Sequence, residues 1–260
     1  MIVWGISDLH LSFARPASRE RYAARWRDHA AQIERNWREV VAPGDVVLLP
    51  GDLSMARNHR EVQPDLEWLG RLPGTKVLGP GNHDRWFNSV AAIRPLLRRS
   101  ILAVGGDALA IRGLVVCGVT GIPTPPWDPS PSDQLAIDRE AEILRRALDQ
   151  AAAIREDPAR PLYVLRHFPP FDIHGRPGPW VEQLERARVT ACVYGHLHLP
   201  SQWAMAVQGS VRGVRYACVA ADAIGFRPLR IDVIDPDDPP GMGHASVRPV
   251  SRSRGRSPRP

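Results

Sequence analysis

The chain has 260 residues, of which 43% are hydrophobic and 24% charged, as is typical of a soluble globular protein with a sizeable core. Its longest apolar runs, such as residues 46–49 and 114–119, are far too short to cross a bilayer, which excludes a membrane-spanning class. The net charge of +6 would suit a nucleic-acid partner, but residues 236–260 carry half of that excess as five arginines against two aspartates. We therefore expect a domain of modest charge, residues 1–235, and a disordered Arg/Pro/Ser-rich tail, residues 236–260.

The first residues, MIVWGISDLH, read as a short strand rather than as a basic leader with a long apolar segment, so we expect no signal peptide. Cysteines at positions 117, 192 and 218 lie inside apolar runs, without the close spacing of a thiolate metal site. A sparse, odd set of this kind favours reduced thiols, and we expect a cytoplasmic protein.

Strand-like and helix-like patterns alternate along the domain, as they do in an α/β fold. Strands are expected at residues 2–6, 46–49 and 76–78. Runs at 101–104, 109–111 and 114–119 are separated only by short turns, which predicts an antiparallel meander. The helices between the first strands show apolar residues at three- and four-residue steps: Tyr22, Trp26, Ala30, Ile33, Trp37 and Val40, then Val62, Leu66 and Leu69.

A proline-rich loop at residues 121–131 leads into a second long amphipathic helix, for which Ser132 is the expected N-cap. Further strands are expected at 162–165 and 190–194, with a helix near 180–187 between them. Strands at 214–219 and 229–234 close the domain as a late pair. Because both halves of the chain contribute strands, we expect two sheets packed face to face with helices outside.

Five short polar clusters each follow a strand-like run. Together they supply carboxylates, one amide and several imidazoles, which are suitable ligands for divalent transition metals. Because open α/β sheets gather their sites at the carboxyl ends of strands, we expect these clusters to converge. They are Asp8-Leu9-His10, Gly51-Asp52, Gly81-Asn82-His83-Asp84, His167 and Gly195-His196-Leu197-His198.

This residue set suits hydrolysis at a pair of metal ions. Asp8 and His10 project to the same side of an extended segment, and the Asp52 carboxylate has two oxygens with which to bridge two cations. Two divalent ions about 3.5–4 Å apart can lower the pKa of a shared water towards neutrality and so create a hydroxide nucleophile. His83, next to Asn82, is placed to protonate the leaving alkoxide as a general acid.

In their order and spacing, the clusters resemble the motif series of the calcineurin-like metallophosphoesterases: D-x-H, G-D, G-N-H-D/E, H and G-H-x-H. The resemblance spans residues 1–200, and residues 54–84 and 163–198 look like a bacterial branch of predicted phosphohydrolases. It implies an α/β fold, a four-layer αββα sandwich of two mixed sheets, with a dinuclear metal site at the carboxyl ends of the strands.

The resemblance also implies a role for each residue. Asp52 would bridge the two metals, and His83 would be a catalytic group held in place by Asp84. The metal ligands would be Asp8, His10, Asp52 and His198 for the first ion, and Asp52, Asn82, His167 and His196 for the second.

Several neighbouring residues have two interpretations each. Asp84 could also cap a helix at residues 86–90, which is compatible with orienting His83. Arg85 and Arg166 flank expected ligands and are candidate phosphate contacts, although an arginine in this arginine-rich chain is more often solvated. The other candidates could line or cover the cleft or simply pack, and they are Trp86, Trp127, Asp172 and His174.

We predict a metal-dependent phosphoesterase, with a phosphodiester favoured over a monoester and with two divalent ions chosen from Mn, Fe, Zn, Co and Ni, Mn favoured. The insert at residues 121–153 could choose among substrates. Two alternatives stay open: a metal-binding scaffold of the same fold without turnover, and a nuclease. Nucleic acid is therefore a possible partner, but a less favoured one. The natural substrate and the oligomeric state are not specified by the sequence.

Overall fold

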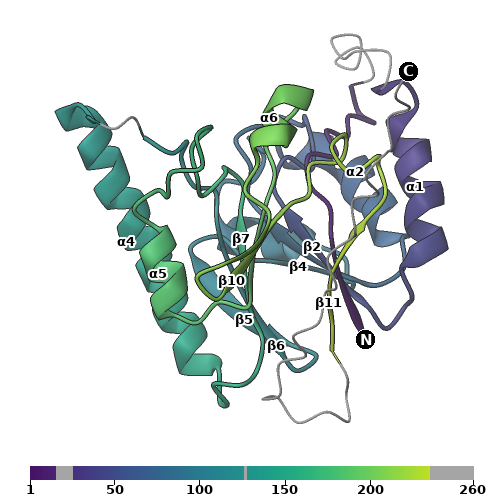
Figure 1. Ribbon diagram of the computed structural model, residues 1–260. Helices are drawn as coiled ribbons and strands as arrows, with labels where there is room; N and C mark the ends of the chain where they lie inside the picture. The colour runs from purple at the N-terminus through teal and green to yellow at the C-terminus, as the bar shows by residue number, and fades with distance from the viewer. Residues whose placement is uncertain (16–25, 126–127, 235–260) are drawn as a thin grey trace, which may run out of the picture.

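The computed structural model describes residues 1–15, 26–125 and 128–234. Two β-sheets pack face to face in its centre, and helices cover both outer faces (Figure 1). Helices α1 (His29–Val40) and α2 (His59–Gly70) pack on the first sheet, while α4 (Pro131–Ile154) and α5 (Val181–Arg186) pack on the second. The expected four-layer αββα sandwich of two mixed sheets is confirmed.

Within the described residues the first sheet has five strands, in the order β11-β1-β2-β3-β4. Strands β1 to β4 are parallel, and β11 pairs antiparallel with β1. The carboxyl ends of these four parallel strands therefore lie side by side at one edge of this sheet. The strands are β1 (Ile2–Gly5), β2 (Val46–Pro50), β3 (Thr75–Gly79), β4 (Ile101–Ala103) and β11 (Leu229–Val233).

The second sheet, counted over the same residues, has six strands in the order β5-β6-β7-β8-β10-β9. Strands β6, β7, β8 and β10 are parallel, with an antiparallel strand at each edge. The strands are β5 (Asp107–Ile111), β6 (Leu114–Val119), β7 (Leu162–Arg166), β8 (Ala191–Tyr194), β9 (Gly209–Val211) and β10 (Val214–Cys218).

Successive side chains of the same strand pack into two different hydrophobic cores. In β2, Val46 and Leu48 enter the core between the sheets, whereas Val47 and Leu49 pack against the helices on the outer face. A strand buried on both faces reads as a continuous apolar run, because successive side chains point in opposite directions. This explains why β2 shows no polar alternation in the sequence.

Two strand pairings expected from the sequence are wrong. Strand β4 pairs parallel with β3 in the first sheet, and the chain then crosses to the second sheet, where β5 and β6 form a hairpin. The expected meander therefore spans two sheets. The late pair is also divided, because β10 joins β8 in the second sheet and β11 joins β1 in the first.

Several helix boundaries also differ from the prediction. Ser130, not Ser132, caps α4, because its hydroxyl accepts from Asp133 N–H while the Asp133 carboxylate accepts from Ser130 N–H. Trp26 precedes α1, and no helix starts at residue 86, since the short helix α3 (Val90–Ile93) begins after its cap Ser89. Helix α6 (Pro200–Met205) was not predicted. Tyr22, Trp127 and the tail at 236–260 lie outside the described residues.

No helix in the described part of the chain combines the length and the apolar character needed to cross a membrane.

Candidate metal centre

The predicted clusters meet where the carboxyl ends of strands from both sheets come together. Backbone hydrogen bonds join their loops: Asp8 N–H donates to Gly51 O at 3.0 Å, and Gly195 N–H donates to His167 O at 3.0 Å. Ser7 N–H donates to Val219 O at 2.8 Å and so connects the loop after β1 to the second sheet. All seven expected ligands lie at this one edge, although they come from loops far apart in the chain.

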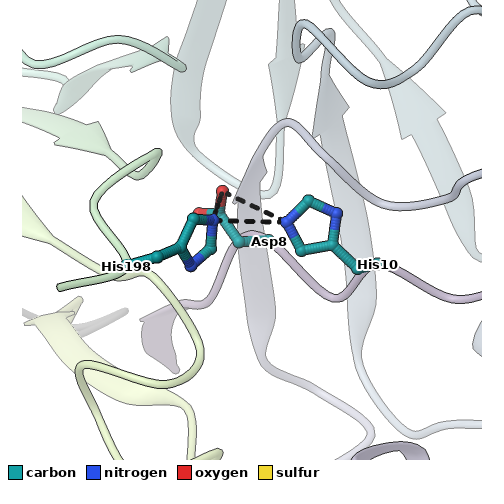
Figure 2. A group of neighbouring side chains, drawn as sticks. All are labelled: Asp8, His10 and His198. Atoms are coloured by element: carbon teal, nitrogen blue, oxygen red, sulfur yellow. Dashed lines mark hydrogen bonds and ion pairs between the residues drawn. The ribbon is translucent and has the colours of Figure 1, made fainter. Parts of the chain in front are cut away.

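One group of possible ligands consists of Asp8, His10 and His198, whose side chains point towards one another (Figure 2). The Nε2 atoms of His10 and His198 are 3.3 Å apart, and His198 Nε2 is 3.4 Å from Asp8 Oδ1. His10 Nε2 lies 4.0 Å from the same oxygen. Two nitrogens and one carboxylate oxygen therefore face a common point.

A second group lies beside the first and consists of Asp8, Asp52 and His167, all buried. Asp52 Oδ2 is 3.5 Å from His167 Nε2 and 3.8 Å from His10 Nε2. Asn82 Oδ1 lies 2.7 Å from His167 Nε2 and 3.1 Å from His196 Nδ1, so the amide and His196 belong to this side. Asp52 thus stands between imidazoles from both sheets.

The donor set fits divalent transition metals. Asp52 Oδ2 is buried, and within the described residues no hydrogen-bond donor reaches it. A buried carboxylate oxygen without a donor is costly, and a cation between it and the facing imidazoles would satisfy it. The donors are carboxylate and amide oxygens and imidazole nitrogens, which suit Mn, Fe, Zn, Co and Ni.

A model of the calcineurin-like phosphoesterase family matches residues 1–200, more than three quarters of the chain. The chain belongs to the calcineurin-like phosphoesterases. Metal-dependent hydrolysis of phosphate esters is what this family's description implies, and the Asp/His groups could hold divalent ions.

Two curated relatives match part of this phosphoesterase. The Gene 66 protein of Mycobacterium phage D29 is 39% identical over 83 residues, which cover 32% of this chain and 40% of the phage protein. The Gene 66 protein of Mycobacterium phage L5 is 33% identical over 81 residues, covering 31% and 39%. The chain thus spans about two fifths of the length of each relative. A solved structure of a protein of unknown function from Aquifex aeolicus aligns at a TM-score of 0.43 and 14% identity, covering 88% of this chain and 95% of that one.

The backbone brings the expected ligands together through unusual conformations. Asp8, His10, Asp52 and His196 have positive φ angles of 57°, 42°, 53° and 71°, a left-handed region that residues other than glycine seldom adopt. Glycines permit the close approach of the loops. A Cβ atom at Gly81 would overlap the Asp52 carboxylate, and one at Gly195 would overlap the Asp8 carboxylate.

Burial and mutual charge set the protonation of the metal-free centre. Burial, reinforced by the charges of Asp84 and Asp8, raises the pKa of Asp52 to about 9. Burial alone would lower the pKa of His198, but hydrogen bonds to Asp222 and Asp8 outweigh it and raise that pKa to about 10. Burial lowers the pKa of His10 to about 3 and that of His196 to about 4. Asp52 and His198 therefore hold protons at neutral pH, whereas His10 and His196 are neutral.

Asp222 is a residue of the centre that the sequence analysis missed. Its Oδ1 lies 3.1 Å from His198 Nδ1, so the carboxylate orients the imidazole whose other nitrogen faces Asp8. His167 is held in the same way, with Nδ1 at 3.0 Å from Pro50 O. Such partners fix the tautomer and orientation of metal-binding histidines. Asp222 follows β10 much as the predicted ligands follow their own strands, a signal that was available in the sequence.

Asp84 has a structural role beside the orienting role expected for it, which stays a prediction. Its carboxylate accepts hydrogen bonds from the backbone N–H groups of Leu53, Ser54 and Gly81 at 3.0–3.3 Å, and from Trp86 Nε1 at 3.0 Å. Both oxygens are therefore occupied, and no contact among the described residues joins them to the His83 ring. Asp84 holds the loops after β2 and β3 together, and Trp86 is buried as part of that support.

The two arginines expected at the phosphate lie in opposite environments. Arg85 is exposed next to His83 and Asp84, where its guanidinium is accessible to a ligand. Arg166 is fully buried on the outer face of the second sheet, paired with Glu140 at 3.0 Å and stacked 3.8 Å from the Trp180 ring centroid. Because consecutive residues of a strand point to opposite faces, Arg166 turns away from the centre that His167 faces, and its expected phosphate contact is wrong.

Proposed function

We propose that this chain is a phosphodiesterase that works with two divalent ions, manganese favoured. The first ion would bind Asp8, His10, Asp52 and His198, and the second would bind Asp52, Asn82, His167 and His196. When bound, two such ions supply a hydroxide nucleophile at neutral pH and positive charge for the phosphoryl oxygens.

One observation carries the proposal: the buried, unpartnered Oδ2 of Asp52 lies within 4 Å of imidazoles from both sheets. His83 N–H donates to the other oxygen, Asp52 Oδ1, at 2.8 Å, which fixes the rotation of the carboxylate. A carboxylate oriented in this way is suited to serve two ions at once.

His83 is our candidate for the group that transfers a proton to the leaving alkoxide. Its side chain is exposed, and its ring centroid lies 5.4 Å from that of His10, at the rim of the centre. Partial burial, aided by the charge of His167, lowers the pKa of His83. General acid catalysis requires the protonated ring, which the charge of nearby Asp84 favours. Arg85, the next exposed cation along the chain, is the candidate contact for a non-bridging phosphate oxygen.

Charge favours a diester. Asp8 and Asp52 bring two negative charges to a centre that would hold four positive ones, and a hydroxide would leave about one positive charge there. A phosphodiester carries a single negative charge, which matches this remaining positive charge. A monoester dianion carries two negative charges and exceeds it.

The experiment compares bis-(p-nitrophenyl) phosphate with p-nitrophenyl phosphate, using metal-stripped protein refilled with Mn²⁺, Zn²⁺, Fe²⁺, Co²⁺ or Ni²⁺. We expect metal-dependent turnover that is faster on the diester and fastest with Mn²⁺. Faster turnover of the monoester would overturn the diester assignment. No turnover of either compound with two metals bound per chain would favour the scaffold alternative.

The proposed location is a reducing cytoplasm. Cys117, Cys192 and Cys218 are all buried and free. Secreted proteins of this size more often pair their cysteines in disulfides, so free core thiols support this proposal.

A further inference from the structure

A groove with a volume of about 320 Å³ opens beside His196. One wall is the loop at residues 123–125, which follows β6, and the other is the loop at 168–176, which follows β7. His196 itself lines the groove, so a phosphate at the metal centre would have one ester arm next to it. The volume is that of an ordinary small-molecule site.

The walls of the groove are largely apolar. Pro123, Pro125, Phe168 and Ile173 all line it, and 64% of the Ile173 residue surface is exposed. The Phe168 ring centroid is 4.3 Å from that of His196, which places an aromatic surface directly beside an expected ligand. Flat apolar surfaces of this kind favour a ring, because rings stack and bury area with little loss of conformational freedom.

The charged residues of the groove neutralise one another. Arg176 Nε forms an ion pair with the Asp172 carboxylate, whose Oδ1 also accepts from His174 N–H and Arg176 N–H at 2.8 Å. A second phosphate would need an additional cation here, as polyphosphates and nucleic-acid backbones do. The lining therefore favours an uncharged group.

Both walls are anchored to one buried residue. Arg166 Nη2 donates to Ile122 O at 2.9 Å beneath the first wall, and its guanidinium stacks on Trp180. Trp180 Nε1 donates to Pro170 O at 3.0 Å beneath the second wall. Thr124 Oγ1 also donates to Pro169 O at 3.2 Å and joins the walls directly. The groove is thus formed before ligand binds, which reduces the entropic cost of binding.

We propose that this groove binds an uncharged aromatic ring, such as a nucleobase, carried on one arm of the phosphodiester. The proposal rests on the phosphodiesterase activity proposed above. A groove of this kind makes small nucleoside or aryl diesters the expected substrate class, rather than pyrophosphates or nucleic-acid chains.

The test uses two diesters with the same leaving group, thymidine 5′-(p-nitrophenyl) phosphate and methyl p-nitrophenyl phosphate. We expect the thymidine compound to have at least about a tenfold higher kcat/KM, and Ile173→Ser to remove most of that advantage. Ile173→Ser should lower kcat/KM for the thymidine compound much more than for the methyl compound, since a methyl arm does not reach Ile173. Leu135→Ser, on an exposed leucine of α4 outside the groove, is the matched control.

A binding measurement separates this proposal from the activity itself. Thymidine added to the Zn²⁺-loaded full chain should shift the Ile173 methyl signal in NMR spectra, and Ile173→Ser should weaken thymidine binding. Equal kcat/KM for the two diesters, or an unmoved Ile173 signal, would overturn the groove assignment while leaving the phosphodiesterase intact. If neither diester is turned over but thymidine still binds, the proposed function fails and the groove stands. Preference for an oligonucleotide over the thymidine diester would overturn the neutral-group assignment.

Discussion

The two sheets contribute different kinds of residue to the candidate metal centre. Loops of the first sheet supply the carboxylates Asp8 and Asp52 and the amide of Asn82, whereas loops of the second supply three imidazoles, His167, His196 and His198. Only His10 breaks the division. Among the seven expected ligands, the second sheet supplies no carboxylate and the first supplies a single imidazole, so two divalent ions would need both sheets.

The ligands from the two sheets, the two halves of the centre, also differ in how they are held in place. Three of the four expected first-sheet ligands, Asp8, His10 and Asp52, lie on left-handed backbone, as does one of the three second-sheet imidazoles, His196. Two of the second-sheet imidazoles are instead oriented by outside partners, His167 by Pro50 O and His198 by Asp222. We infer that the first half decides whether metal binds at all, and that the second half adjusts how tightly.

The largest effect is expected from Asp52→Asn, which changes an expected ligand from the first sheet. The amide cannot supply a negative charge to two ions, so we expect loss of tight binding of both metals. Activity should fall by at least about a thousandfold, more than the 10–100-fold loss typical when a residue that only supports a ligand is replaced. Metal content per chain by mass spectrometry is the measurement. Asp138→Asn on the exposed face of α4 is the control, and two metals retained by Asp52→Asn would exclude it as the bridge.

His83→Ala tests a first-sheet residue that is not a ligand. We expect both metals to remain, while kcat on alkyl diesters falls by about 10²–10⁴-fold through loss of the general acid. Aryl esters have leaving groups that need no proton and should lose much less. Equal losses on alkyl and aryl esters would argue against the acid role.

A smaller effect is expected in the second half, from Asp222→Asn. The variant removes the charge that orients His198, so affinity for one of the two metals should fall by about 10–100-fold. Competition with a chelator of known affinity measures this loss, again beside Asp138→Asn. An unchanged affinity would mean that His198 is held in place by its backbone alone.

The mildest perturbation is a change of pH. Asp52 and His198, with pKa values of about 9 and about 10 in the metal-free protein, carry protons at pH 7 that a metal must displace. Metal affinity should therefore rise with pH from 7 to 9 and level off above about pH 10. Calorimetry in buffers of different ionisation enthalpy should show proton release at pH 7, and binding without proton release would contradict these pKa shifts.

The sequence was sufficient to predict which residues gather at the centre. Each cluster follows a strand, and in an α/β fold the carboxyl ends of parallel strands share an edge. Orientation was harder to predict. Arg166 and His167 are neighbours in sequence, yet one faces the outer helices and the other faces the metal centre, because the side-chain direction alternates along a strand. A pattern of residue types near a ligand does not show which face they occupy.

Strand partners were predicted less well than strands. Strands β4 and β5 are close in sequence but belong to different sheets, as do β10 and β11. Pairing depends on which core each strand's apolar faces fill, and both cores accept the same Val, Leu and Ile side chains. Asp222 was missed although it follows β10, because it belongs to no motif and its position after a strand does not show that it contacts His198.

The left-handed backbone at Asp8, His10, Asp52 and His196 has a consequence for the evolution and engineering of this protein. Each non-glycine residue in such a conformation costs about 1–3 kcal/mol, so the backbone itself favours glycine at all four positions, against the hydrogen bonds that the Asp8 and Asp52 carboxylates accept. A design protocol that scores backbone strain alone would choose these sites first and would remove the expected ligands. Side chains kept on strained backbone at all four turns are what a binding function, rather than fold stability, would require.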